Sequence, residues 1–506
     1  MSKKKLASLY SEGLSNMRLE QFSKAINSMK IILDIDPSYT KALFVLGEIF
    51  FKASQYQEAI VYYSKILLIE PNNEEAYYFI ANILQNTNRD KEAISFYTQA
   101  IDINPKYKEA YNNIGLSLTK IGNNEEAILY YDKALKIDST YLSAYNNIGC
   151  SLTKLKNYKA AIHIYKKALD VNPDDINICF NLALILQEEA LLEESYSYFN
   201  LILKKKSNFT QAAENFITML IQLDKLDKIN SLTNYNSIMI EICTLIAYYI
   251  KGSFKEAKIL IDNINEKSSI FVSDDHKKFV ISYFTFIHNL IVYKLTVEDT
   301  LCSKNNTPIY HIGESHCLSF AHQTLDLNNQ SYIVKPLIVF GAKAWHLNST
   351  AKNKFKAYFE HHLHSLKKGS FVMLSFGEID CRIDEGIIKH YLKTGITLEN
   401  IVEKTVNEYI NYTSNILHAL ELNFIYFGIH APVIKDNQSK STKAVLQVKI
   451  VKLFNQYLLN LTTKKNLNMI NVYTLTVNKI GESNMQYMCD ETHLNPSILK
   501  LLKFHF

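Results

Sequence analysis

Residues 308–316 decide the fold of the C-terminal half, and they read Pro308-Ile309-Tyr310-His311-Ile312-Gly313-Glu314-Ser315-His316. Most of the first five are apolar, as in a buried strand, and a glycine and a serine follow directly. A second stretch repeats this plan, because the apolar run 371–376 leads into Gly377-Glu378-Ile379-Asp380. A strand followed by a tight turn presents side chains at the carboxyl end of an α/β sheet, where ligands bind. The sequence therefore predicts a functional site at these turns.

Strands and helices alternate through the rest of this half. We expect strands at 308–312, 331–340, 371–376, 423–429 and 468–477, and helices at 316–325, 349–366, 398–420 and 442–461. Such alternation predicts a parallel sheet covered by helices on both faces and joined by right-handed crossovers.

A third polar block, Asp490-Glu491-Thr492-His493, lies near the C-terminus. A serine becomes a nucleophile only with a base nearby, and His493 can take the proton of Ser315. Asp490 can hold the imidazole tautomer and stabilise the imidazolium. Each block alone has a structural alternative, namely a helix-capping serine, a capping aspartate and a surface histidine. The three in this order favour a catalytic triad.

The order of the blocks resembles that of the SGNH (GDSL-type) hydrolases, whose blocks are Gly-Asp-Ser, then Gly-x-Asn-Asp, then Asp-x-x-His. The resemblance covers residues 308–506. It implies a flavodoxin-like α/β/α sandwich with a five-stranded parallel sheet in the order 2-1-3-4-5, and catalysis by Ser315, His493 and Asp490. Two positions depart from the family pattern: Glu314 replaces the aspartate of the first block, and Ile379 replaces the asparagine of the third.

The same resemblance implies the oxyanion and substrate residues. Gly341 follows the second strand where the family places an oxyanion-hole glycine, and Gly377 and Asp380 match the third block. An isoleucine side chain cannot donate a hydrogen bond, and the loss of one oxyanion donor commonly costs ~100- to 1000-fold in turnover. Our hypothesis is that Arg382 replaces the missing donor, and that Glu378 and Asp380 either hold Arg382 in place or act on a sugar hydroxyl.

The N-terminal half repeats itself every 34 residues. Proline recurs at 37, 71, 105 and 173, with serine at 139 and 207. A small residue recurs in the first helix of each unit, at Gly13, Gly47, Ala81, Gly115, Gly149 and Ala183, and in the second helix at Ala25, Ala59, Ala93, Ala127, Ala161 and Ser195. Small residues let paired helices approach closely, and proline closes a unit because it cannot continue a helix. The pattern resembles the tetratricopeptide repeat (TPR), with about six units over residues 6–207.

Stacked repeats of this kind form an all-α superhelix with a concave groove. The register places Asn113, Asn147 and Asn181 at one equivalent position. Asparagine amides can pair with both the donors and the acceptors of an extended peptide, and the arrangement resembles the asparagine ladder in the TPR region of O-linked N-acetylglucosamine transferases. We expect these three residues to bind a peptide or protein segment, and repeat drift in an asparagine-rich chain is the alternative.

Two further regions complete the expected organisation of the 506 residues. Residues 208–300 read as degenerate helical repeats that cap the solenoid and dock the catalytic domain. Residues 301–307 are polar and turn-rich, which indicates a linker.

Composition excludes several classes of protein. The net charge of +5 is small for this length and does not indicate nucleic-acid binding. The basic N-terminus is followed by no apolar signal core, and the longest apolar stretch, 238–250, is interrupted by Glu241. Seven widely spread cysteines indicate reduced thiols and a cytoplasmic protein. Cysteines 317, 381 and 489 flank the blocks without metal-ligand spacing, so we expect no metal and no cofactor.

These observations lead to a functional hypothesis in two parts. The C-terminal domain is expected to be an SGNH-type serine esterase that removes or transfers an O-acyl group, with acetyl on a glycan or glycosylated protein as the expected substrate. The repeats are expected to recruit a protein or peptide partner. The alternative is an interaction scaffold whose SGNH-like domain has lost catalysis through Ile379. Hydrolysis and acyl transfer, the acyl group, the acceptor and the oligomeric state stay open.

Overall fold

The computed structural model describes residues 3–501 except 236, 267–273, 297–306, 328–329, 349–351, 383–385, 434–440, 479–481 and 489–492. The chain packs as two compact units, Met1–Ile185 and Leu186–Phe506. The boundary falls inside the sixth repeat, ahead of the expected end of the solenoid at residue 207. Most of the expected linker, residues 301–306, lies outside the described residues.

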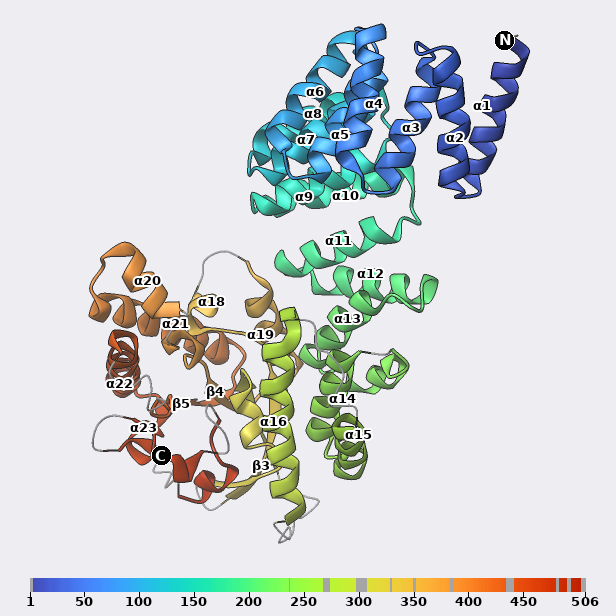
Figure 1. Cartoon of the computed structure of the whole chain (residues 1–506). Helices are drawn as coiled ribbons and strands as arrows, with labels where there is room; N and C mark the ends of the chain where they lie inside the picture. The colour runs from blue at the N-terminus through green and yellow to red at the C-terminus, as the bar shows by residue number, and fades with distance from the viewer. Residues whose placement is uncertain are drawn as a thin grey trace. The chain divides into compact units, whose positions relative to one another are not determined.

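The first unit consists of paired helices in its described part (Figure 1). The pairs are α1 (Lys3–Arg18) and α2 (Phe22–Ile35), α3 (Thr40–Lys52) and α4 (Tyr56–Ile69), α5 (Glu74–Asn86) and α6 (Asp90–Ile103), α7 (Lys108–Lys120) and α8 (Asn124–Ile137), and α9 (Leu142–Lys154) and α10 (Tyr158–Val171). Helix α11 (Ile176–Glu188) crosses into the second unit. A residue of left-handed conformation ends the turn inside each of these pairs, at Glu20, Ser54, Asn88, Gly122 and Lys156. Such a residue closes the end of a helix.

Tyrosine on the second helix of a repeat packs against the small residue of the first. A methyl group on Gly115 would lie 2.5 Å from Tyr131 Cε1, and one on Gly149 would lie 2.4 Å from Tyr165 Cζ. Both tyrosines are buried. Glycine is therefore required at these positions because the ring occupies the space of a side chain, and the close helix approach expected from the sequence is confirmed.

The second unit begins with helices that continue the repeat and then dock on a sheet. They are α12 (Leu192–Lys205), α13 (Thr210–Gln222), η1 (Leu226–Leu232), α14 (Ile238–Lys251), α15 (Phe254–Glu266) and α16 (Asp274–Thr296). The left-handed turn recurs at Ala190 and Asp224, so the 34-residue register extends past residue 207. Tyr249 of α14 donates its hydroxyl to the carbonyl of Leu318 at 3.2 Å, and Lys294 of α16 donates to the carbonyl of His322 at 2.9 Å. These bonds fix the helices to the sheet domain.

The sheet has six strands, in the order β2-β3-β1-β4-β5-β6. They are β1 (Thr307–Gly313), β2 (Thr324–Leu327), β3 (Gln330–Ile338), β4 (Phe371–Ser375), β5 (Asn423–Phe427) and β6 (Asn468–Ile470). Strand β2 pairs antiparallel with β3, whereas the neighbouring pairs among the other five are parallel. The parallel strands have the expected 2-1-3-4-5 order once β2 is left aside. The expectation of a five-stranded, all-parallel sheet was wrong.

Two expected elements near the sheet were also wrong in extent. The helix expected at 316–325 is only α17 (His316–Ser319). The chain reverses at His322, which has a φ of 61°, and enters the edge strand β2. The strand expected at 468–477 ends at Ile470, and the short helix α23 (Tyr473–Thr476) follows.

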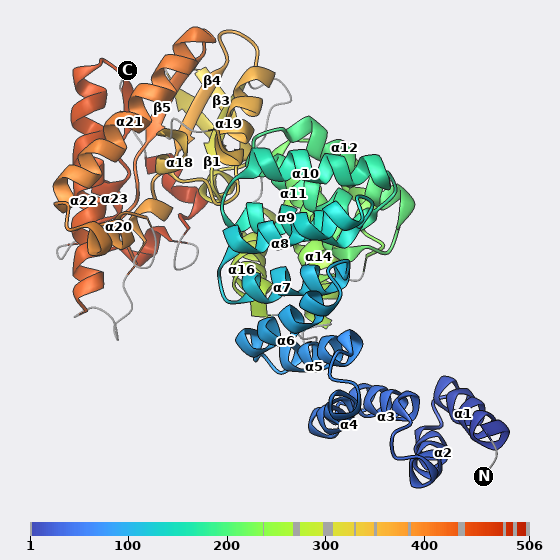
Figure 2. The same ribbon diagram turned by 90° about the horizontal axis from the view of Figure 1, so that it is seen from above.

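Side chains alternate between the two faces of the sheet. Long helices cover the face of Tyr426, among them α19 (Lys354–Ser365), α21 (Leu398–Ala419) and α22 (Thr442–Lys464). Helices α21 and α22 lie side by side (Figure 2). The face of Ile425 and Phe427 packs on α17 and on Leu494 and Ile498 of the C-terminal segment, which includes η3 (Met485–Tyr487) and η4 (Pro496–Leu501). Shorter helices α18 (Ala344–Asn348) and α20 (Gly386–Thr394) and the turn η2 (Ile379–Cys381) complete the unit. This packing brings His493, next to Leu494, to the end of β1.

Candidate active site

Ser315 lies directly beyond β1, at the carboxyl end of the sheet. Gly313 pairs with Ser375 of β4, and a methyl group on Gly313 would lie 2.4 Å from Ser375 Oγ. Glycine therefore lets the central strands approach where the serine turn begins. Ser315 itself has helical dihedral angles and precedes the four-residue helix α17.

The structure brings Ser315 and His493 together across 178 residues of sequence. Nε2 of His493 lies 2.9 Å from Oγ of Ser315. Ser315 is only 3% exposed and His493 only 5%. This is the contact that a nucleophile and its base require. Asp490, the expected orienting residue, lies outside the described residues, and its role stays a prediction.

Glu314 is a second acceptor beside the serine hydroxyl. Ser315 Oγ is hydrogen-bonded to Glu314 Oε2, and Oε1 of the same carboxylate accepts from the hydroxyl of Tyr283 at 2.9 Å. A serine hydroxyl has one proton, so it donates either to Glu314 or to His493. Burial and the adjacent Glu314 carboxylate raise the pKa of Tyr283 well above its ordinary value, which keeps the phenol protonated as a donor.

Tyr283 and Phe286 of α16 are site residues that the sequence did not reveal. The Phe286 ring stacks on the imidazole of His493, with ring centroids 3.6 Å apart and an interplanar angle of 9°. Both side chains are buried. In the sequence they are two aromatic residues of an apolar helix, and no local signal separates them from core positions.

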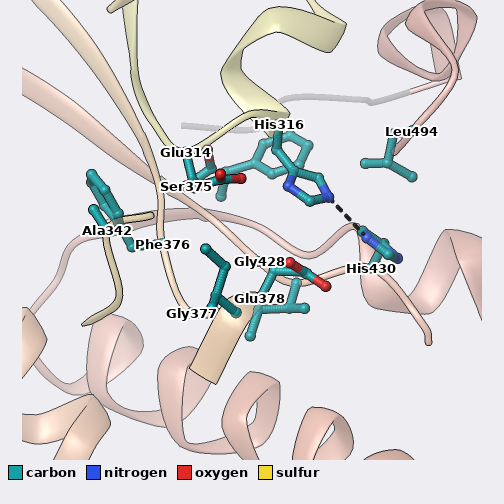
Figure 3. A pocket seen from close by; sticks show the side chains of 13 residues that line it. Glu314, His316, Ala342, Ser375, Phe376, Gly377, Glu378, Gly428, His430 and Leu494 are labelled. Atoms are coloured by element: carbon teal, nitrogen blue, oxygen red, sulfur yellow. Dashed lines mark hydrogen bonds between the residues drawn. The ribbon is translucent and has the colours of Figure 1, made fainter. Parts of the chain in front are cut away.

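A small cavity lies at the carboxyl ends of β1, β4 and β5 (Figure 3). Its volume is about 20 Å³, and its lining includes Glu314, His316, Ile379 and His430. That volume holds about one water molecule. Neither Ser315 nor His493 belongs to the lining. Their sequence neighbours Glu314, His316 and Leu494 do, so the cavity adjoins the serine–histidine pair.

Two histidines face each other across this cavity, as Figure 3 shows. Nδ1 of His430 lies 2.7 Å from the carbonyl oxygen of Ala431 and must donate to it. Nε2 of His316 lies 3.1 Å from Nε2 of His430, so one of these two nitrogens donates to the other. Burial, together with His493, lowers the pKa of His316 well below its ordinary value, which keeps it neutral. His430 was missed because no motif surrounds it in the sequence.

The residues of the block Gly377-Glu378-Ile379-Asp380 take different places around the cavity. Gly377 has a φ of +115°, and a methyl group there would lie 2.6 Å from Phe454 Cζ, so glycine is required. Ile379 lines the cavity. Asp380 is fully buried, and its carboxylate accepts from the backbone N–H of Ala344 at 2.7 Å and of Trp345 at 3.4 Å. Asp380 thus braces the turn that follows β3.

That braced turn begins near Gly341, the expected oxyanion-hole glycine. Gly341 has a φ of 67°. Its neighbour Ala342, rather than Gly341, belongs to the cavity lining. The role of Gly341 in an oxyanion hole stays a prediction.

Arg382 forms an ion pair with Glu378, with Nη2 and Oε2 2.7 Å apart. Burial acts to raise the pKa of Glu378, but the adjacent Arg382 guanidinium outweighs it and holds that pKa at about 2. Both residues line a neighbouring cavity of about 80 Å³, which His430 also lines. Arg382 therefore neutralises a buried carboxylate, and its role as an oxyanion donor stays a prediction.

The three asparagines of the proposed ladder bond to the preceding repeat. Asn147 Nδ2 donates to Asn112 Oδ1 at 2.9 Å, and Asn181 Nδ2 donates to Asn146 Oδ1 at 2.8 Å. Asn113 donates to Asn82 Oδ1 at 3.0 Å. The amides are partly buried and link successive repeats. Peptide binding by these residues stays a prediction.

Metal and membrane sites are both absent from the described residues. They contain no cluster of three or more histidine, cysteine or acidic side chains that could hold a metal ion. None of the helices in the described part of the chain combines the length and apolar character needed to cross a bilayer.

Comparisons with known proteins identify the repeats. Tetratricopeptide-repeat family models match residues 10–74, 50–113, 109–141 and 143–175. They confirm TPR repeats in the N-terminal half and support a role in protein–protein interaction. No curated protein matches the chain.

Similar solved structures cover about a third of the chain. A crystal structure of MamA is 26% identical, covers 33% of this chain and 96% of its own, and gives a TM-score of 0.31. YrrB, described as a TPR protein with an unusual peptide-binding site, is 21% identical, covers 34% and 88%, and gives 0.30. TTC0263, described as a thermophilic TPR protein in Thermus thermophilus, is 18% identical, covers 36% and 98%, and gives 0.30.

Proposed function

We propose that the chain is a serine esterase of the SGNH type, which removes or transfers an O-acyl group, and whose repeats bind a protein or peptide partner. The observation that carries the proposal is the 2.9 Å contact between His493 Nε2 and Ser315 Oγ. It lies where the first of the parallel strands ends, and the 2-1-3-4-5 order of those strands supports the flavodoxin-like fold of this family.

The reaction follows from the roles of the two side chains. Ser315 Oγ attacks the carbonyl carbon of the ester while His493 Nε2 takes the hydroxyl proton. The bond from that carbon to the alcohol oxygen then breaks, His493 returns the proton to the departing oxygen, and acyl-Ser315 remains. Water activated by the same imidazole releases the carboxylic acid. A sugar hydroxyl in place of water gives acyl transfer instead.

The enclosed site supports a small acyl group. The adjoining cavity of about 20 Å³ holds about one water molecule, so a small acyl group such as acetyl demands less rearrangement than a long acyl chain. Acetyl on a glycan or glycosylated protein is the substrate class that this feature and the family resemblance favour together. Glu378, Arg382 and His430 of the neighbouring cavity supply polar groups that a hydroxylated substrate could contact.

Hydrolysis of p-nitrophenyl acetate tests the proposal. Ser315→Ala and His493→Ala should each abolish turnover, and the double variant should lose little more, because the two residues act as one unit. Ser319→Ala is the matched control, since Ser319 is a buried serine of the short helix α17 that Ser315 precedes. Near-wild-type turnover in either single variant would exclude the assigned pair.

A catalytically inactive scaffold is the second candidate. Ile379 lines the cavity where the family pattern has a hydrogen-bond donor, which favours loss of activity. A fluorophosphonate probe separates the two candidates. Labelling of Ser315 supports the esterase, whereas silence of the probe together with peptide binding by the repeats supports the scaffold.

A further inference from the structure

One face of α16 contacts both halves of the proposed catalytic pair. Tyr283 and Phe286 are three residues apart, so they lie on the same side of the helix. Phe286 contacts His493, and Tyr283 contacts Glu314, which in turn holds Ser315. A single helix that precedes β1 in the chain therefore touches the base and the serine turn at once.

Phe286 determines the plane of the base. The imidazole of His493 lies parallel to the Phe286 ring at a centroid distance of 3.6 Å. The His316 ring lies near it as well, at 4.9 Å and an interplanar angle of 37°. An imidazole is free to turn about its χ2 bond unless neighbours restrict it. Stacking holds the ring in the plane that directs Nε2 to Ser315.

Tyr283 holds the serine turn. Its hydroxyl donates to Oε1 of Glu314, which leaves Oε2 directed to Ser315. Tyr283 thereby fixes the carboxylate that accepts from the serine hydroxyl, and with it the turn that presents Ser315 to His493.

Helix α16 is itself well anchored. Phe286, Ile287, Leu290 and Ile291 are all at most 1% exposed. The helix packs on α14 and α15, and Figure 1 shows it between this helix pair and the sheet. Lys294 fixes its end to the carbonyl of His322 at 2.9 Å. A rigid element of this kind can hold side chains to the tolerance that catalysis requires.

We propose that Phe286 and Tyr283 are positioning residues of the esterase site, so that residues 308–506 do not contain the whole site. This inference rests on the proposed esterase function. It assigns to α16 a task beyond capping the repeats, because the orientation of His493 depends on a ring that this helix supplies.

The test uses full-length variants and p-nitrophenyl acetate. Phe286→Leu keeps an apolar side chain but removes the stacked plane, and kcat should fall about 10- to 100-fold, because a misplacement of about 1 Å costs that much. KM should stay within about twofold, since Phe286 does not bind the acyl group. Phe286→Tyr restores the stacked ring and should recover most of kcat. Tyr283→Phe should lower kcat by a smaller factor.

Phe284→Leu is the matched control. Phe284 is only two residues away on α16 and stacks on His288 instead of His493. Its replacement should leave kcat unchanged, which separates positioning from a general loosening of the helix.

A nuclear magnetic resonance signature tests the contact without any core substitution. In full-length protein with labelled histidine, the Cε1–H resonance of His493, assigned by its loss in His493→Gln, should lie upfield because the Phe286 ring current acts on it. A resonance at the ordinary position would overturn the inference.

The kinetic outcomes distinguish two failures. If the fluorophosphonate probe labels Ser315 in the wild type and labels Phe286→Leu equally fast, the positioning role is wrong while the esterase stands. Faster labelling of Phe286→Leu would mean that the Phe286 ring shields Ser315 from the probe, which would likewise refute the positioning role. If the wild type is not labelled at all, the esterase proposal fails, and the inference falls with it.

Discussion

Asp380→Asn should change the pH dependence of folding stability. The Asp380 carboxyl is fully buried, and burial raises its pKa to about 7 from 3.8, despite the N–H groups of Ala344 and Trp345 that favour the ionised form. Below about pH 4 the carboxyl is protonated in both the folded and the unfolded chain. As the pH rises toward 7, the unfolded chain loses this proton while the folded chain keeps it, so stability is lost over that window.

The size of this effect follows from the two pKa values. At about 1.4 kcal/mol for each pH unit between 3.8 and about 7, the wild type loses about 4 kcal/mol of unfolding free energy. About 3 kcal/mol of that loss falls between pH 5 and pH 8. An asparagine never ionises and can still accept one of the two backbone N–H groups. The variant should therefore gain about 3 kcal/mol relative to the wild type across this range.

Urea unfolding at pH 5, 6, 7 and 8 measures this difference. Trp345 is the only tryptophan, and its backbone N–H is bonded to Asp380, so its fluorescence reports on this part of the fold. Other titrating groups are common to both proteins and cancel in the comparison. Asp262→Asn, on the exposed side of α15, is the control for replacing a carboxylate by an amide.

A flat difference for Asp380→Asn would refute the reasoning. It would mean that the carboxyl ionises in the folded chain as easily as in the unfolded chain. The assignment of Asp380 as a buried brace of the turn at Ala344 and Trp345 would then be wrong.

Two further predictions concern buried pairs and repeat contacts. Arg382→Ala should lower the unfolding free energy by about 3–5 kcal/mol, because Glu378 is left buried without its partner. The double variant Glu378→Gln with Arg382→Met should cost less unfolding free energy. Urea unfolding measures both variants, and equal costs would contradict the buried ion pair. Replacing Asn113, Asn147 and Asn181 together by alanine should remove the inter-repeat hydrogen bonds of three side chains. The stability of the first unit should fall by about 3 kcal/mol, at about 1 kcal/mol for each side chain, and peptide capture should be lost. Unchanged capture would mean that the groove binds by another face.

The repeats were predictable because their signals are local and periodic. The repeat glycines at 13, 47, 115 and 149 each face the second helix of their own repeat, so spacing in the sequence reports the contact directly. The left-handed turns at Ala190 and Asp224 show that the register continues beyond residue 207, where proline and the small residues no longer mark it.

The strands and the serine–histidine pair were predictable for a similar reason. Apolar runs bounded by glycine indicate buried strands, and the blocks after them contain Ser315 and His493. The edge strand β2 was missed because Thr324–Leu327 is short and overlaps residues 316–325, which were expected to form a helix.

The rest of the site depends on long-range packing. Phe286 contacts His493 across 207 residues of chain, and His430 contacts His316 across 114. Asp380 reads as a substrate residue in its motif, yet the fold turns its carboxylate onto the backbone of Ala344. No local pattern encodes these contacts, since they exist only once the sheet is formed.

Mass spectrometry of the acyl-enzyme tests the central claim most directly. Full-length protein is mixed with p-nitrophenyl acetate, quenched in acid during turnover and digested. The account predicts one acetyl group on the peptide that contains Ser315, absent from Ser315→Ala and strongly reduced in His493→Ala. Turnover with the acetyl group on another residue, or with no adduct that depends on His493, would contradict the assignment of Ser315 and His493 as nucleophile and base.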